Sequence, residues 1–109
     1  MKVLFKEPGK QIRPIVIDRS LKTLQDLVDG NIEHYKLNER TGLLFNEEGK
    51  LRGLKANFYL PALNDMIVGN AIFIGEDGEE FTDISKEDAD IVATFMTYLV
   101  GLWPTEEEA

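Results

Sequence analysis

Residues 66–74, MIVGNAIFI, form the most apolar stretch of the chain, and this stretch limits the folds that the sequence can adopt. Its length and its β-branched and aromatic residues favour a β-strand. Gly69 and Asn70 in the middle of the run predict a bulge or a close approach of another backbone. We therefore expect this strand to lie centrally in a sheet around which the other elements are arranged.

Shorter apolar segments separated by turn signals predict further strands. Residues 3–5 and 11–18 flank the turn signal Pro8-Gly9 and predict an opening hairpin. Pro14 has no N–H, so it must lie at an edge or a bulge of the sheet. Further strands are expected at 31–37, 43–45 and 50–54, the last two as a hairpin in which Gly49 takes a left-handed conformation. Residues 81–84 read as short extended chain, and residues 55–65 as a loop or a single helical turn.

A short amphipathic helix is predicted after Ser20, which has the character of an N-cap residue. Leu21, Leu24, Leu27 and Val28 share one face of this helix, as the 3.6-residue period requires. Gly30 is expected to end it, because glycine readily takes the left-handed conformation found just after helices.

A longer helix is predicted from the N-cap Ser85 to about residue 100. Its apolar residues form two adjacent stripes, which is wider than the single face that an ordinary surface helix buries. This width predicts either burial within the monomer or a subunit contact. For a homo-oligomer, the contact is expected to involve Ile91, Phe95, Tyr98 and Leu102.

The order of these elements predicts an α+β fold, with a mixed or mainly antiparallel sheet of about five or six strands and two helices packed on it. The 109 residues suit a single domain, expected at 1–104, followed by a disordered acidic tail at 105–109. The chain contains no cysteine, which suits a reducing bacterial cytoplasm. No segment has the length and apolarity of a membrane span or a signal peptide, so we expect no membrane association.

The net charge of -8 hides a difference between the two halves of the chain. Residues 1–55 carry eleven Lys and Arg against eight Asp and Glu, whereas residues 56–109 carry only Lys86 against twelve acidic residues. A sequence pI near 4.6 argues against nucleic-acid binding, which normally requires a basic surface. The acidic half is interpreted either as a solvated surface or as a DNA mimic that engages a basic partner.

Catalytic and metal-binding patterns are not apparent in the sequence. Both serines are best explained as helix caps, and the single histidine, His34, is interpreted as a solvated strand residue. One histidine and no cysteine do not suit a zinc site. The acidic cluster at 76–83 lacks the ligand spacing of an EF-hand and is interpreted as a solvated turn. No glycine-rich turn opens a helix as in nucleotide-binding loops. We therefore assign no catalytic residue, metal or cofactor.

Cationic, amide and aromatic side chains gather instead around the predicted hairpin and the irregular connection after it. Such groups on loops of a rigid sheet can hold a nucleotide or another small anion. The predicted ligand-binding residues are Arg40, Lys50, Arg52, Lys55, Asn57, Tyr59 and Asn64. The alternative is a solvated loop.

Three features of the chain resemble the bacterial and phage domain-of-unknown-function family 3846. They are Asn-Glu-Glu-Gly-Lys at 46–50, Asn57 with Leu60, and Asp-Met-Ile-Val-Gly at 65–69, supported by the opening pattern MKVLxxEPGK, in which x stands for Phe5 and Lys6. Lys-Ala precedes Asn57 where relatives more often show a proline. The resemblance implies an α+β fold and an origin in phage, plasmid or integrated mobile DNA, and it transfers no functional residue.

The resulting hypothesis is a non-enzymatic, homo-oligomeric binding protein of a phage or mobile element that sequesters a nucleotide-like small anion. One alternative is an acidic inhibitor or DNA mimic acting on a host protein. A third is an enzyme that uses a divalent metal bound by the carboxylates at 76–83. These functions are argued by analogy with small accessory proteins of mobile elements.

Overall fold

The computed structural model describes residues 1–101, with side chains up to residue 97. Its helices are α1 (Leu21–Val28), the 3₁₀ turn η1 (Pro61–Leu63) and α2 (Lys86–Gly101). Its strands are β1 (Lys2–Lys6), β2 (Arg13–Val16), β3 (Ile32–Asn38), β4 (Thr41–Asn46), β5 (Ala56–Leu60), β6 (Asp65–Val68), β7 (Ala71–Asp77) and β8 (Glu80–Thr82). Residues 102–109, with Leu102 and the predicted tail, lie outside the described residues, as does the Tyr98 side chain.

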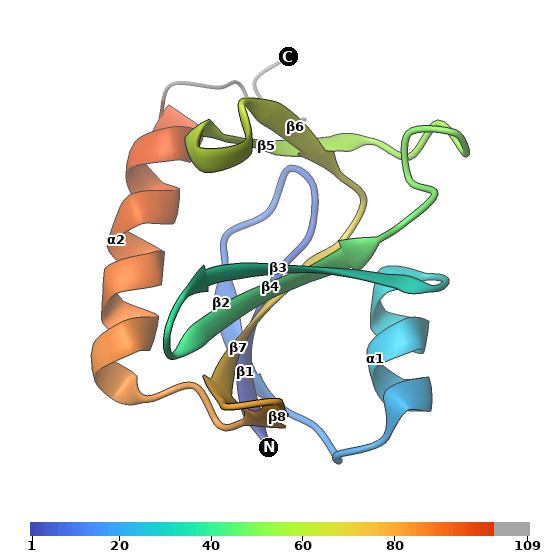
Figure 1. Ribbon diagram of the computed structural model, residues 1–109. Helices are drawn as coiled ribbons and strands as arrows, with labels where there is room; N and C mark the ends of the chain where they lie inside the picture. Colours follow the sequence, from blue (N-terminus) through green and yellow to red (C-terminus); the bar gives the residue numbers. More distant parts are fainter. Residues whose placement is uncertain (102–109) are drawn as a thin grey trace.

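In the described part of the chain, six strands form an antiparallel sheet in the order β2-β1-β7-β4-β3, and β8 pairs with β7. The strands β5 and β6 form a separate hairpin. Figure 1 shows α1 and α2 on opposite faces of the large sheet, with the β5–β6 hairpin above it. The predicted α+β class is therefore confirmed, and so is the mainly antiparallel sheet.

Side-chain alternation along the strands divides the core into two clusters. In β1, Val3 and Phe5 face α1, whereas Leu4 packs with the cluster that covers the opposite face. The α1 cluster also contains Leu24 and Val28 of the helix. The opposite cluster is covered by α2 and by the β5–β6 hairpin, where the rings of Phe58 and Phe73 stack with centroids 5.9 Å apart. The sheet is thus buried on both faces.

The opening hairpin and the placement of Pro14 are confirmed. The strand β2 pairs only with β1 and forms one edge of the sheet, so the missing N–H of Pro14 interrupts no inner ladder. Both predicted N-caps are also confirmed. The Ser20 hydroxyl accepts a hydrogen bond from Thr23 N at 3.1 Å, and the Ser85 hydroxyl accepts one from Asp88 N at 3.0 Å.

The end of α1 differs from the prediction in its left-handed residue. Asp29, with φ 62°, takes the left-handed position, and Gly30 follows with φ 153°. Distant side chains complete this end: Asn46 Nδ2 donates to the carbonyls of Val28 at 3.1 Å and Asp29 at 2.9 Å, and Asn70 Nδ2 donates to Leu27 O at 2.9 Å. A Cβ on Gly30 would lie only 2.6 Å from Asn46 Nδ2. Glycine is required here to let the asparagine approach.

The predicted strand at 50–54 is wrong, because the chain leaves β4 through consecutive turns. Asn46 Oδ1 accepts a hydrogen bond from Glu48 N at 2.7 Å, which starts this turn segment. It continues with Arg52 N donating to Glu48 O at 2.9 Å. The left-handed glycine is Gly53, with φ 68°, and not Gly49. The partners of β4 are therefore the distant strands β3 and β7.

The predicted strand at 66–74 is two strands that belong to different sheets. Gly69 breaks it with φ 75°, so that β6 pairs with β5 and β7 crosses into the large sheet. The central position is confirmed for β7, which lies between β1 and β4. The preceding connection contains the expected helical turn as η1, but residues 56–60 form the strand β5 and not a loop.

Candidate functional site

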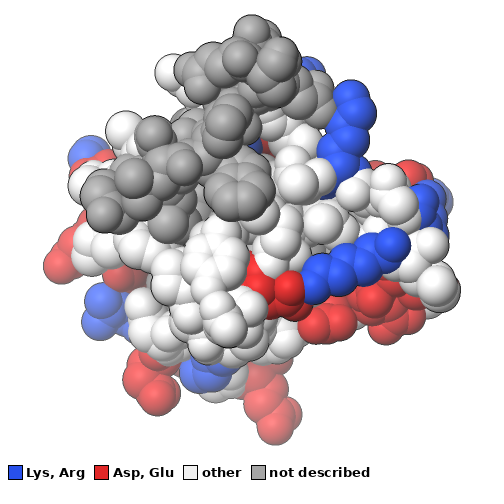
Figure 2. Space-filling model, turned by 90° about the horizontal axis from the view of Figure 1, so that it is seen from above, with Lys and Arg blue, Asp and Glu red and all other residues white. Residues whose placement is uncertain are grey.

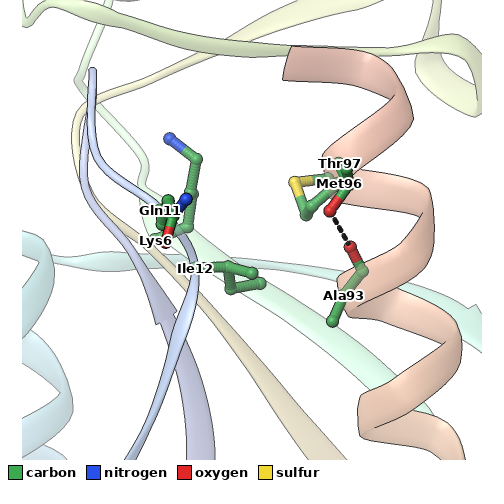
Figure 3. A pocket seen from close by; sticks show the side chains of 6 residues that line it. All are labelled: Lys6, Gln11, Ile12, Ala93, Met96 and Thr97. Carbon is green, nitrogen blue, oxygen red and sulfur yellow. Dashed lines mark hydrogen bonds between the residues drawn. The ribbon is translucent and has the colours of Figure 1, made fainter. Parts of the chain in front are cut away.

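A pocket of about 300 Å³ lies between the β1–β2 hairpin and α2. Ile12, Ala93 and Met96 give it apolar walls. Its polar groups come from Lys6 at the end of β1, from Gln11 in the hairpin loop and from Thr97 on α2. Figure 3 shows the Lys6 side chain running along the wall opposite Met96 and Thr97. The pocket is of a size that suits a small molecule.

Lys6 is the unusual residue of this pocket, because only 1% of its surface is exposed. Its Nζ donates hydrogen bonds to Glu7 O at 2.7 Å and to Asn57 Oδ1 at 2.9 Å. Both acceptors are uncharged oxygens. No carboxylate among the described residues forms an ion pair with Lys6. A lysine is rarely buried in this way without a negatively charged partner.

Burial lowers the pKa of Lys6, because removing the side chain from water disfavours its charged form. The charge of nearby Glu7 acts in the opposite direction and is the weaker influence. The Glu7 carboxylate is itself engaged by Lys10 Nζ at 2.7 Å and Arg13 Nη2 at 3.2 Å. A negative group close to Lys6 would oppose the effect of burial and favour the charged form of the lysine.

Asn57 holds this nitrogen in place from β5. It is 6% exposed, and besides accepting from Lys6 it donates through Nδ2 to Lys6 O at 2.9 Å and to Gly69 O at 2.7 Å. One side chain thus joins β1, β5 and the break between β6 and β7. Of the predicted ligand-binding residues, Asn57 is the one that the structure brings to the Lys6 pocket, behind the lysine.

The other predicted site residues do not converge on one pocket. Arg40 lies in the turn after β3 and binds Asp88 of α2, at the opposite end of α2 from the β5–β6 hairpin (Figure 1). Lys50 forms an ion pair with Asp65, and Arg52 one with Asp29 at 3.0 Å. These three cations are thus engaged by carboxylates within the chain.

Lys50 and Lys55 each line a further hollow, whereas Tyr59 and Asn64 contact each other. Lys55 borders a hollow of about 350 Å³ with Glu7, Lys10 and Asn70. Lys50 borders one of about 320 Å³ between the turn segment after β4 and β6. Tyr59 donates a hydrogen bond to Asn64 across the β5–β6 hairpin. The predicted set is therefore distributed over several surfaces.

The opposite charges of the two halves of the chain meet inside one molecule. Arg40 binds both oxygens of Asp88, at 3.0 and 3.1 Å, and Lys50 pairs with Asp65. Lys36 Nζ lies 3.6 Å from Glu76 Oε1. Figure 2, viewed from the β5–β6 end, shows basic and acidic side chains interspersed around the visible face. At least three carboxylates of the acidic half are therefore partnered by cations of the first half.

Because of the Arg40–Asp88 ion pair, we expect the free energy of unfolding to decrease at acidic pH. Hydrogen bonding to Arg40, followed by that to Ser85, lowers the pKa of Asp88. The pair therefore stabilises the fold above the pKa of an unfolded aspartate, near 4, and this contribution disappears as pH falls through the lowered value. We expect Asp88→Asn to lower the free energy of unfolding by about 1 to 3 kcal/mol at pH 7. The difference should shrink below pH 4 in urea titrations.

The control for this prediction is Asp90→Asn, which removes a carboxylate from the same helix. Asp90 is exposed and pairs with Lys86 at 2.7 Å, and exposed pairs of this kind contribute little. A difference between wild type and Asp88→Asn that stays constant from pH 7 to pH 3 would show that the Asp88 charge does not contribute.

His34 has a partner that the sequence did not predict. Its Nε2 lies 3.0 Å from Glu76 Oε2, and its ring packs edge-on against Phe81. Gly42 leaves the space for this contact, since a Cβ there would lie 2.9 Å from the Glu76 carboxyl carbon. Within the described residues, no three His, Asp or Glu side chains lie close enough together to hold a metal ion. The His34–Glu76 pair therefore joins β3 to β7 across β4.

Sequence reasoning missed Lys6 as a site residue, although one signal was present. The period-2 alternation of β1 places Lys6 on the same face as Leu4, which is the buried α2 face. Lys6 is followed by Glu7, and a neighbouring pair of opposite charges is not itself a sign of burial. The α2 residues Ala93, Met96 and Thr97 gave no such signal, because only the tertiary fold brings them opposite β1.

No helix in the described part of the chain is long and apolar enough to cross a membrane. Among curated proteins and among solved structures, no match was found for this chain. A family model described as "Domain of unknown function (DUF3846)" matches residues 1–99, which is nearly the whole chain. The protein therefore belongs to the DUF3846 family, as its sequence motifs indicated.

Proposed function

We propose that this protein is a non-enzymatic binding protein that holds a nucleotide-like small anion in the pocket beside Lys6. The observation that carries the proposal is a buried lysine, Lys6, which is 1% exposed, lines the pocket with its side chain and has no carboxylate partner among the described residues. An anionic ligand would supply the missing countercharge and so favour the protonated lysine.

The rest of the pocket is compatible with such a ligand. Ile12 and Met96 offer apolar contacts of the kind that suit an aromatic ring, and methionine sulfur contacts rings favourably. The Gln11 amide offers both a donor and an acceptor. The acidic-inhibitor alternative has less support, because several carboxylates of the acidic half are partnered within the chain. A phage or mobile-element origin and a cytoplasmic location remain part of the proposal.

The test compares wild type with Lys6→Met, which keeps an unbranched side chain one atom shorter than lysine and removes its charge. Using adenosine monophosphate and inorganic phosphate as probes in calorimetric titrations, we expect the variant to bind at least about tenfold more weakly, because a hydrogen bond to a charged group is lost. Lys22→Met is the matched control, since Lys22 is exposed on α1 and pairs with Asp26. Equal affinities of wild type and Lys6→Met would contradict the proposal, provided that both fold.

We also propose self-association through α2. Ile91 is 59% exposed and Phe95 43% exposed, one helical turn apart, whereas Val92 and Met96 of the same helix are buried. An exposed apolar pair of this kind suits a subunit contact. Native mass spectrometry of freshly purified protein reports both the number of subunits and any bound small molecule. A monomer across the accessible concentration range would contradict the homo-oligomer.

A further inference from the structure

Lys6 differs from five other lysines of this chain in a way that bears on its chemistry. Lys10, Lys22, Lys36, Lys50 and Lys86 each lie within ion-pair distance of a carboxylate, and the side chains of all five are at least 41% exposed. Lys6 is buried, and its two acceptors are a backbone carbonyl and an amide oxygen. Burial therefore favours proton loss at Lys6, whose pKa it lowers.

The two hydrogen bonds of Lys6 are as many as a neutral amine can donate. An ammonium has three N–H groups, whereas a neutral amine has two N–H groups and a lone pair. Glu7 O and Asn57 Oδ1 accept two hydrogen bonds, which occupies both N–H groups of the neutral form. In the neutral form these two bonds leave the lone pair unused, and a neutral lysine that lines a pocket can act as a nucleophile.

We propose that Lys6 forms a reversible imine with small aldehydes or ketones that enter the pocket between the β1–β2 hairpin and α2. The Nζ lone pair attacks the carbonyl carbon, the C–N bond forms, and a proton passes from the nitrogen to the carbonyl oxygen to give a carbinolamine. The hydroxyl group then takes up a second proton and leaves as water when the C–O bond breaks, the nitrogen lone pair forms the C=N bond, and the nitrogen releases its last proton. The reaction needs no oxidant or reductant, and its only by-product is water.

The surroundings of Lys6 favour this reaction in two further ways. Ile12, Ala93 and Met96 line the pocket with apolar surface, which limits the water that would hydrolyse the imine. Burial lowers the pKa of Lys6, so a larger share of this side chain is neutral at pH 7 than in an exposed lysine. The inference uses the pocket of the proposed function but requires the neutral and not the charged form of the lysine.

The experiment treats the full chain at pH 7 with dilute propanal and sodium cyanoborohydride, which reduces imines to stable amines. Peptide mapping by mass spectrometry then gives the labelling rate at every lysine of the wild-type protein. We expect Lys6 to be labelled at least about tenfold faster than Lys22 or Lys86, because exposed lysines stay almost fully protonated at this pH. The advantage should shrink as pH rises towards 10, where the exposed lysines also become neutral.

A second variant tests whether the pocket is the route to Lys6. Ala93→Leu adds bulk to the pocket wall and leaves the lysine in the sequence, whereas Thr94→Leu adds bulk on the exposed side of α2. The labelling rate of Lys6 should fall about tenfold in Ala93→Leu, to about the rate of the exposed lysines, and should stay unchanged in Thr94→Leu. Labelling at Lys6 no faster than at Lys22, or insensitive to Ala93→Leu, would overturn the inference.

The outcome is separable from that of the proposed function. Adenosine monophosphate binding without preferential labelling would refute imine formation and leave anion binding in place. Preferential labelling without binding of the anionic probes would refute the anion proposal and leave the nucleophile. If both hold, the bound anion should slow labelling, because it favours the protonated lysine.

Discussion

Replacing Asn57 with leucine is expected to lower the free energy of unfolding by about 3 to 5 kcal/mol, because three buried polar groups lose their partner at once. Asn57 Nδ2 donates to Lys6 O and Gly69 O, and Asn57 Oδ1 accepts from Lys6 Nζ. Leucine is at least as large as asparagine, so the loss reports hydrogen bonding and not an empty cavity. Urea denaturation at pH 7 measures the change, with an unchanged slope as evidence that unfolding remains two-state.

Asn31→Ala is the control for this prediction. Asn31 is exposed, and its side chain only accepts a long hydrogen bond of 3.4 Å from Gln25. Its removal should change stability by no more than about 0.5 kcal/mol. If Asn57→Leu were as mild as this control, Asn57 would not be the link between β1 and β5 that its contacts describe.

The position of Asn57 also indicates that the sequence motif of the family has a structural role. Asn46 completes the end of α1, Asn57 joins three segments, and Leu60 is 2% exposed in the core. These positions therefore specify the fold. Lys6, by contrast, stands between the residues of MKVLFKEPGK that carry the resemblance. The family motif thus explains how the chain folds, and the chemistry of the candidate site must be read from the structure.

Local patterns were sufficient for the elements whose partners lie nearby in sequence. The N-caps Ser20 and Ser85, the edge strand with Pro14 and the central strand β7 follow from hydrogen bonding and alternation within a few residues. The class of fold follows from the same signals. These predictions were correct because the interactions concerned depend mainly on residues close together in the sequence.

Local patterns failed where a side chain has a distant partner. Asn46 and Asn70 turn towards α1, and the backbone leaves the expected strand directions on either side of them. The predicted hairpin at 43–54 and the continuous strand at 66–74 are therefore wrong. The site shows the same limit, since the residues opposite Lys6 come from α2, more than eighty residues later in the sequence.

Gly75→Ala is expected to destabilise the fold by about 3 kcal/mol, because overpacking against backbone cannot be relieved by a side-chain rotation. A Cβ on Gly75 would overlap the carbonyl oxygen of Asp83 and lie 2.8 Å from its carbonyl carbon. The chain after β8 would have to move away from β7. That movement would also disturb Ile84, which is 3% exposed and donates its N–H to Lys2 O at 2.9 Å.

The matched control, Gly53→Ala, separates this clash from the loss of conformational freedom. Gly53 has φ 68°, and beyond its chain neighbours no atom of the described residues lies within 4 Å of the point that a Cβ would occupy. Alanine there should therefore cost only about 1 kcal/mol of backbone strain. Thermal and urea unfolding of both variants give the comparison. Equal losses of unfolding free energy in the two variants would mean that the segment after β8 can move to make room for the added Cβ at little cost. A much larger loss at Gly75 would show that the segment after β8, which leads into α2, packs tightly against β7 at Asp83.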